Sequence, residues 1–163
     1  MDACPLHLLM ICRLENPDDE SFIRKLMIET LAGQLDACSW HDEIRESLLD
    51  AQYRIRRAGF RASAGNQPGT IVLIHGEPVA WYIAADFDDE IRLVNLVVAN
   101  QHRGKGLGSA ILRQLLIHSD HSGKTLRLSV AINNPRAADL YARFGFRRTG
   151  DDGVHHFMER PAQ

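Results

Sequence analysis

Cysteine is scarce in this sequence, with 3 copies among 163 residues. Cys4, Cys12 and Cys38 show no C-x-x-C spacing and form no even set, so neither a disulfide framework nor a zinc ribbon is indicated. No apolar run approaches the roughly 20 residues that a membrane-spanning helix needs. The stretch from Leu6 to Ile11 is too short to be the core of a signal peptide. We therefore expect a protein of the reducing cytoplasm with no membrane partner.

Neither sign of charge is in large excess, because 19 Lys and Arg residues accompany 21 Asp and Glu residues, for a net charge of −2. A nearly neutral chain generates no global positive field, so the composition does not support nucleic-acid binding. Hydrophobic residues make up 45% of the chain and charged residues 25%, which is ordinary for a globular protein. The length suits one hydrophobic core, and we see no internal repeat. The sequence therefore predicts a single domain over residues 1–163.

The most informative segment that is present reads VVANQHRGKGLGS, from Val97 to Ser109. An apolar run ends there, a basic loop with alternate glycines follows, and an amphipathic pattern begins. Glycine lets a ligand approach the main chain, and the first N–H groups of a helix lie unpaired at its positive end. The segment therefore predicts a phosphate or pyrophosphate site. The predicted contacts are the main-chain groups of Arg103, Gly104, Lys105, Gly106, Leu107, Gly108 and Ser109.

Three classes of glycine loop are alternatives for this segment. A nucleoside-triphosphate loop requires G-x-x-x-x-G-K-[ST], whereas the lysine of this loop lies between two glycines. A dinucleotide fingerprint requires G-x-G-x-x-G and an acidic residue on the next strand. The register from Gly104 gives G-x-G-x-x-S instead, and Arg127 lies on that next strand. The third pattern, R-x-x-G-x-G, is matched by Arg103, Gly106 and Gly108.

A second motif reads NNPRAADLYARFGF, from Asn133 to Phe146. Asn134 is a favourable N-cap, and Pro135 suits the first helical position. One helix face would carry the apolar residues spaced at i, i+3, i+4 and i+7, namely Ala137, Leu140, Tyr141 and Phe144. The motif predicts a short helix that ends at Gly145 and is followed by a strand.

These two motifs together, R-x-x-G-x-G and N-x-x-A-x-x-L-Y-x-x-x-G-F, resemble those of the GNAT family of N-acetyltransferases. The resemblance extends from Ile71 to Met158. It implies an α/β (α+β) fold with a mixed central sheet of about seven strands flanked by about four helices. It further implies that the strand before the glycine loop splays away from its neighbour and leaves a cofactor cleft.

Hydrophobic periodicity and turn residues predict the element order β-α-α-β-β-β-α-β-α-β-β. The expected features are a strand over Leu6 to Cys12, a helix that starts at Asn16 and Pro17, a second helix that ends at Gly59, a hairpin at Gly76, and an acidic turn from Asp86 to Glu90 before a strand that ends at Val98.

The resemblance implies transfer of an acetyl group from acetyl-CoA to a primary amine by direct attack. The carbonyl oxygen then needs hydrogen-bond donors, and the departing thiolate benefits from an acid. Through the resemblance, the backbone of Leu96, Val97 and Val98 is assigned to the pantetheine arm and the carbonyl, and Tyr141 to the acid. Tyr141 as a core aromatic is the alternative. Asn134 caps its helix, contacts the cofactor, or does both.

The general base is less apparent. The position that carries a glutamate in the histone-acetylating members is occupied by Arg92. Glu90 lies two residues earlier on the same strand face, from which it would reach the site directly or through water. Alternatively, Glu90 belongs to a solvated acidic turn with Asp86, Asp88 and Asp89 that attracts a cationic amine. Asn95 would order a water but cannot act as a base.

No metal is predicted. His118 and His121 form an H-x-x-H pair, but a zinc site needs more ligands at regular spacing. His155 and His156 are adjacent on a predicted strand, so their side chains point to opposite faces and cannot easily share an ion. The expected partner is a small-molecule amine or a protein amino group, with a possible homodimer. The aromatic residues Trp40, Tyr53, Trp81 and Tyr82 line an acceptor pocket or pack in the core. A non-catalytic acyl-CoA-binding or sensor module is the alternative function.

Overall fold

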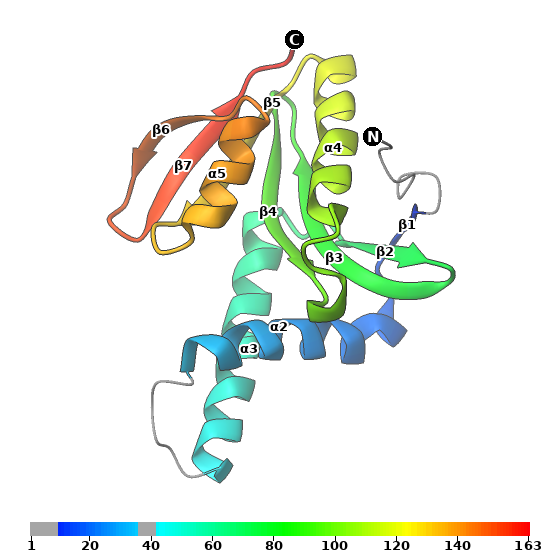
Figure 1. The fold of residues 1–163 in the computed structure, drawn as a ribbon, viewed down its shortest axis with the longest axis vertical. Helices are drawn as coiled ribbons and strands as arrows, with labels where there is room; N and C mark the ends of the chain where they lie inside the picture. The colour runs from blue at the N-terminus through cyan, green and yellow to red at the C-terminus, as the bar shows by residue number, and fades with distance from the viewer. Residues whose placement is uncertain (1–9, 36–41) are drawn as a thin grey trace.

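A mixed sheet of seven strands forms the centre of the computed structural model, which describes residues 10–35 and 42–163 (Figure 1). The strands are β1 (Met10–Leu14), β2 (Thr70–Ile74), β3 (Glu77–Asp86), β4 (Glu90–Val98), β5 (Thr125–Ala131), β6 (Arg147–Asp151) and β7 (His155–Arg160). They lie in the order β1-β2-β3-β4-β5-β7-β6, with β4 parallel to β5 and the other neighbours antiparallel. The mixed sheet predicted from the sequence is confirmed.

Part of the predicted first strand is present, since Met10 to Cys12 lie in β1. Its remainder, Leu6 to Leu9, lies outside the described residues, as do Cys4, Cys38 and Trp40.

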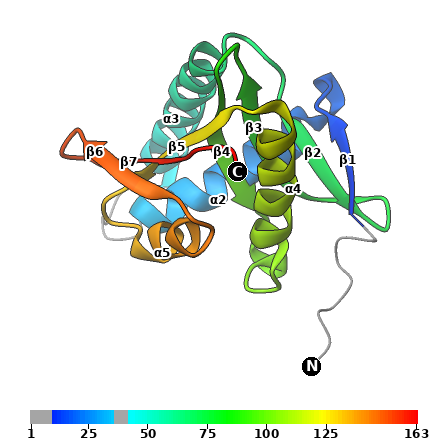
Figure 2. The same cartoon turned by 90° about the horizontal axis from the view of Figure 1, so that it is seen from above.

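Helices cover both faces of the sheet (Figure 1). They are α2 (Glu20–Leu35), α3 (Asp42–Ser63), α4 (Leu107–Ser122) and α5 (Pro135–Arg143), with 3₁₀ turns η1 (Pro17–Asp19) and η2 (Asn100–His102). One buried cluster joins α2 and α3 to the sheet around Trp81, and another joins α4 and α5 to the opposite face around Leu128. Figure 2 displays α3 and α4 on opposite sides of the strands. Apart from the two short turns, the element order is the one predicted.

The first helical segment begins as the sequence indicates. The side chain of Asn16 accepts a hydrogen bond from the Asp18 N–H at 2.9 Å, and Pro17 occupies the first turn. The Asp19 carboxylate returns to the Asn16 N–H at 2.9 Å, which completes a reciprocal cap. That first turn is a 3₁₀ turn, and the α-helix proper starts at Glu20.

The second helix does not end at Gly59, so that prediction was wrong. It continues to Ser63, because the apolar face extends past the glycine: Phe60 packs against Trp81 with ring centroids 6.3 Å apart. A glycine inside a helix costs only about 1 kcal/mol relative to alanine, and burial of the following turn outweighs that cost. The chain leaves the helix where Gly65 and Asn66 adopt positive φ angles of 59° and 61°.

Two irregularities in β4 shape the middle of the sheet. The register with β3 pairs Ile83 with Asn95 and then Ala84 with Leu93, so Val94 is an extra, bulged residue. The parallel ladder with β5 runs from Glu90–Thr125 to Leu93–Leu128 and stops there, although both strands continue. Beyond Leu93, the edge of β4 that faces β5 is therefore open, which is the splay that the resemblance implies.

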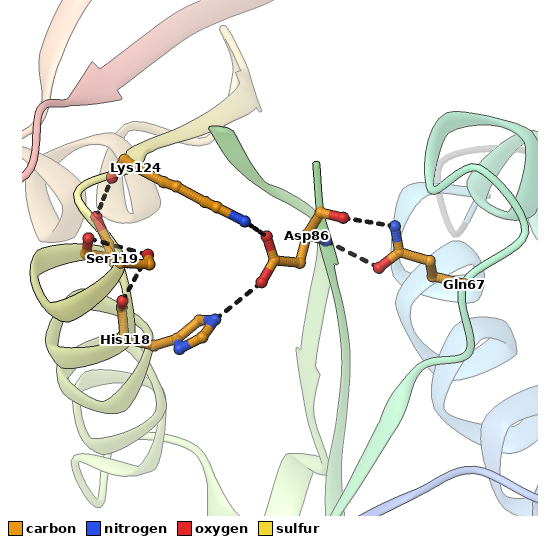
Figure 3. Close-up of polar contacts among 6 residues, drawn as sticks. Gln67, Asp86, His118, Ser119 and Lys124 are labelled. Carbon is orange, nitrogen blue, oxygen red and sulfur yellow. Dashed lines mark hydrogen bonds and ion pairs between the residues drawn. The ribbon is translucent and has the colours of Figure 1, made fainter. Parts of the chain in front are cut away.

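A cluster around Asp86 ties together the end of the sheet where β4 begins (Figure 3). The Asp86 carboxylate contacts Nε2 of His118 at 3.0 Å and also Nζ of Lys124, at the far end of α4. Its backbone N–H and C=O each bond the side-chain amide of Gln67 at 2.9 Å. Lys124 and His118 together hold the pKa of Asp86 below its usual value. Asp86 is exposed, with 41% of its side chain accessible, as a solvated acidic turn requires, but its carboxylate is also paired with two cations.

Candidate cofactor and acceptor sites

A cleft with a cavity of about 540 Å³ lies where β4 separates from β5, on the side of α4 and α5. It brings together most of the residues that the sequence selects. The lining consists of Thr30, Leu96, Val97, Val98, His102, Arg103, Gly104, Gly106, Leu107, Gly108, Ser109, Asn134, Arg136, Ala137, Leu140, Tyr141 and Arg143. Two motifs that are far apart in the chain therefore form opposite walls of one cleft.

The glycine loop presents unpaired main-chain donors to this cleft. Gly104 and Gly106 have φ angles of 74° and 83°, in the left-handed region that favours glycine. Gly106 is the N-cap of α4 and, lacking a side chain, leaves the first amides of that helix uncapped. The positive end of the helix dipole adds to these donors. Uncapped amides at the positive end of a helix are the donor arrangement that binds phosphate groups.

The cationic side chains around the loop have different roles. Nε of Arg103 donates to the Val98 carbonyl at 2.9 Å, so this side chain braces the loop against the end of β4. Lys105 is exposed and is not among the residues that line the cavity. Arg136 and Arg143 of α5 do line it, and they supply positive charge from the opposite wall. The sequence carries no signal for the contribution of Thr30 of α2, because only the tertiary fold brings α2 to the loop.

The open end of β4 forms the floor between these walls. Leu96 and Val98 pack toward the α4–α5 side and Val97 toward the α2–α3 side, as the pleat requires. Beyond Leu93, where the β5 ladder stops, alternate residues of β4 turn their main-chain groups to the gap. The Ala99 N–H bonds the Val79 carbonyl of β3, so the main-chain groups of Val97 also face β3, whereas those of Leu96 and Val98 face the gap. This floor is suited to an extended polar arm such as pantetheine.

Tyr141 and Asn134 line the wall formed by α5. Burial raises the pKa of Tyr141 to about 12, so the phenol is protonated at neutral pH. Its ring meets Phe146 edge-on, with centroids 5.7 Å apart. Asn134 accepts a hydrogen bond from the Ala137 N–H at 3.2 Å, so the capping role predicted for it is present.

Glu90 is not solvated, which corrects that alternative. It is buried at the start of β4, and Arg92 and Arg127 each bond one of its carboxylate oxygens. Burial by itself would raise the pKa of Glu90, but the two guanidinium groups outweigh burial and lower it. Arg127 comes from β5, and the parallel register that pairs it with Arg92 brings both cations to one carboxylate.

These charged residues belong to a second cavity, of about 570 Å³, on the α3 side of the sheet. Its lining consists of Phe60, Ser63, Glu90, Arg92, Leu93, Val94, Arg127, Leu128, Ser129, Thr149, Phe157, Met158 and Glu159. Leu93 and Leu128 are the last pair before the strands separate, so this cavity also extends to the gap. The two cavities therefore approach the gap between β4 and β5 from opposite faces of the sheet.

Other predicted candidates lie elsewhere. Trp81, Tyr53 and Tyr82 are buried core residues, and the Trp81 indole donates to Glu15 at 2.7 Å. Cys12 is exposed on β1 and contacts Gln114. Within residues 10–35 and 42–163, no group of three His, Cys, Asp or Glu side chains is placed to hold a metal ion. No helix in the described part of the chain is both long and apolar enough to cross a membrane.

The open mixed sheet, the glycine loop before α4 and the separation of β4 from β5 are the features that the two sequence motifs imply. The model of the acetyltransferase (GNAT) family matches residues 20–146, and the chain belongs to this family. An uncharacterized N-acetyltransferase of Bacillus subtilis, YobR, is 36% identical over 66 residues. That match covers 40% of this chain but only 26% of the relative.

Solved structures share the fold at low sequence identity. The PaiA N-acetyltransferase of Thermoplasma acidophilum, in complex with coenzyme A, gives a TM-score of 0.71 at 16% identity, over 93% of this chain and 98% of that one. The putative acetyltransferase YncA of Salmonella typhimurium, with its cofactor acetyl-CoA, gives 0.60 at 20% identity, over 94% of each chain. The ribosomal-protein-S18-alanine N-acetyltransferase of Escherichia coli gives 0.62 at 20%, again over 94% of each.

Proposed function

We propose that this protein transfers an acetyl group from acetyl-CoA to a primary amine of a small molecule or a protein. The observation that carries the proposal is the meeting of three features in one cleft. Uncapped amides of the glycine loop, the open end of β4 and the protonated Tyr141 all line the same 540 Å³ cavity. Each feature suits a different part of an acyl-CoA thioester: the amides suit the pyrophosphate, the strand end suits the pantetheine arm, and the phenol suits the sulfur.

Acetyl-CoA, when bound, supplies the activated acetyl thioester. The amides from Gly104 to Ser109, with Arg136 and Arg143 of α5, would hold the pyrophosphate. The Arg103 N–H, which the sequence also assigned to this role, is instead donated to the Asn100 carbonyl at 3.2 Å. Main-chain groups of Leu96 and Val98 align the pantetheine arm and donate to the carbonyl oxygen as it gains negative charge. Asn134 caps α5 and faces the same arm.

Tyr141 is the proposed general acid toward the departing sulfur. A phenol whose pKa is raised to about 12 keeps its proton at neutral pH, so it is a donor throughout the physiological range. With a thioester bound, the Tyr141 hydroxyl would donate a hydrogen bond to the sulfur and supply the proton that the departing thiolate takes up.

Glu90 as general base stays a prediction, and its surroundings weigh against it. Both carboxylate oxygens are bonded to arginines, and the lowered pKa makes Glu90 a weak proton acceptor. Asn95 lies past the split of the strands with its Nδ2 atom buried and without a hydrogen-bond partner among the described residues. A water bonded there would provide another route for the proton from the amine to solvent.

Isothermal titration with acetyl-CoA tests the proposal, with NAD and ATP as controls. Thiol release measured against a panel of amines then separates an enzyme from the alternative, an acyl-CoA sensor. We expect acetyl-CoA to bind, NAD and ATP not to bind, and an amine to release thiol. Binding without release by any amine would favour the sensor, and no binding would refute the assignment of the cleft.

We further infer that residues 1–163 act as one domain in a bacterial cytoplasm. The continuous sheet from β1 to β6 supports a single domain, and the Bacillus relative supports a bacterial source. A homodimer stays a prediction, which sedimentation velocity of the purified protein tests.

A further inference from the structure

We propose that the second cavity binds an acceptor that carries a carboxylate group in addition to its primary amine. The inference rests on the proposed acetyltransferase function and names its substrate class. The cavity lies on the α3 face and extends to Leu93 and Leu128, where the strands separate. An acceptor held there places its amine at the gap, opposite the cleft assigned to acetyl-CoA.

The most exposed charged side chains of the cavity are cationic. Arg92 and Arg127 enclose the single buried carboxylate of Glu90, so two positive charges surround one negative charge. The side chains of both arginines are about half exposed, at 46% and 47%, whereas that of Glu90 is 7% exposed. A ligand in the cavity therefore meets guanidinium groups rather than the carboxylate between them.

Donors remain on these guanidiniums after their internal contacts are made. Arg127 uses Nε for Glu159, at 3.1 Å, and Nη1 for Glu90, and its Nη2 has no hydrogen-bond partner among residues 10–35 and 42–163. Arg92 uses Nη2 for Glu90 and contacts the Ser63 carbonyl through Nη1 at 3.4 Å. Each guanidinium carries five N–H donors in a planar fork that matches a carboxylate.

Glu90 also fixes the two arginines in place before a ligand arrives. Ordering a long side chain on binding opposes association, and an arginine that is already held avoids much of that cost. Arg92 is held a second time, because its guanidinium lies 5.0 Å from the centre of the Phe87 ring. The pair is therefore a preorganised receptor for an anion.

Glu159 supplies the counter-charge that an acceptor would replace. It lies on β7, its side chain is 33% exposed, and Arg127 is the cation it contacts through one N–H. With Glu159 included, the four groups sum to zero, so an empty cavity is neutral. A carboxylate ligand competes with Glu159 for Arg127, and removal of the Glu159 charge should therefore strengthen binding.

The remaining lining suits the carbon skeleton of a small acceptor. Phe60, Val94 and Phe157 supply apolar surface, and Phe157 is 41% exposed although its side chain is large and hydrophobic. The rim of the cavity carries hydroxyl groups from three elements, those of Ser63, Ser129 and Thr149.

The test compares acceptors that differ only in the carboxylate. Protein amino acids and 4-aminobutyrate are each paired with their carboxamides, and kcat/KM is measured for each member with acetyl-CoA. The ratio of acid to amide is then compared between wild type and variants, so that differences in amine pKa cancel. We expect Arg127→Gln to lower this ratio by about 10-fold or more, since hydrogen bonds to charged groups are lost.

Three further variants make the result specific. Glu159→Gln should raise the ratio of kcat/KM for acid over amide. Arg127→Lys should give a ratio between those of wild type and Arg127→Gln. Arg54→Gln, which removes an equal charge from an exposed site on α3, should leave it unchanged. The melting temperature and the acetyl-CoA affinity of each variant identify any loss that comes from misfolding or from the cofactor cleft.

Binding of the acids is measured separately by saturation-transfer NMR with coenzyme A present, which requires no turnover. If the acids bind to wild type but not to Arg127→Gln, the carboxylate site is supported even when no amine is acetylated. That combination would refute the proposed reaction but not the binding site. If amides are acetylated as well as acids in wild type, or if no acid binds, the carboxylate proposal is overturned while acetyl-CoA binding stands.

Discussion

Replacement of Gly106 by alanine probes the phosphate loop directly. At φ 83° an alanine Cβ crowds the following carbonyl oxygen, which costs about 1–2 kcal/mol. No atom outside the immediate chain lies within 4 Å of the position a Cβ would occupy, so the backbone alone causes the strain. Gly153, in the turn between β6 and β7, has the same φ of 83° and the same open surroundings. It therefore provides a control with matched strain.

Both variants should lose about 1–2 kcal/mol of unfolding free energy, which for a chain of this size corresponds to about 2–8 °C in melting temperature. Only Gly106→Ala should also weaken acetyl-CoA binding. If the loop relaxes and loses one charge-assisted N–H contact to the pyrophosphate, worth about 1.5–3 kcal/mol, the dissociation constant rises about 10- to 100-fold.

Isothermal titration with acetyl-CoA and calorimetric melting measure the two effects side by side. The bulkier Gly106→Val should abolish binding, because a β-branched side chain tolerates a positive φ even less than alanine. Equal acetyl-CoA affinity in wild type, Gly106→Ala and Gly153→Ala, with the expected loss of stability in both variants, would refute the phosphate loop.

Three other changes test the remaining parts of the molecule. Tyr141→Phe keeps the packing on Phe146 but removes the acid, so kcat should fall about 100-fold at constant acetyl-CoA affinity; an unchanged kcat in stopped assays would assign Tyr141 to the core. Glu90→Gln removes the buried negative charge that two arginines bond, so calorimetry should record a loss of about 1–3 kcal/mol in the free energy of unfolding. The pH profile of kcat should not move; a shifted acidic limb would instead identify Glu90 as the base. Arg160 bonds the Asp120 carboxylate at 2.7 and 3.2 Å and, with the Gln163 N–H, lowers the pKa of Asp120. A carboxyl group whose pKa is lowered on folding stabilises the folded state at pH values above its unfolded pKa of about 3.9. That stabilisation is lost as the pH falls through the folded-state pKa. Melting curves between pH 7 and 3 should therefore show a steeper acid decline in wild type than in Asp120→Asn, and parallel curves would contradict this pairing.

Local sequence was sufficient for features that depend on neighbours along the chain. The cap at Asn134 and the proline after it were predicted from residues within one or two turns, and the structure confirms them. The helix predicted to end at Gly145 ends at Arg143, with Phe144 as its C-cap and Gly145 next, at a φ of 86°. The element order was predictable for the same reason, because hydrophobic periodicity reports which face of each segment is buried. Gly59 misled the prediction because a packing contact outweighed a local preference.

The environment of Glu90 could not be predicted in this way. Arg127 is 37 residues further along the chain, and it meets Glu90 only because β4 and β5 pair in a particular register. The same register stops at Leu93, which opens the gap and leaves a cavity on each face. The sequence by itself thus determined the loop, the helix starts and the family pattern, since these follow from local backbone and burial preferences. Tertiary structure decided which charges neutralise one another and where the two cavities lie, because those outcomes depend on the register and separation of strands that are distant in the chain.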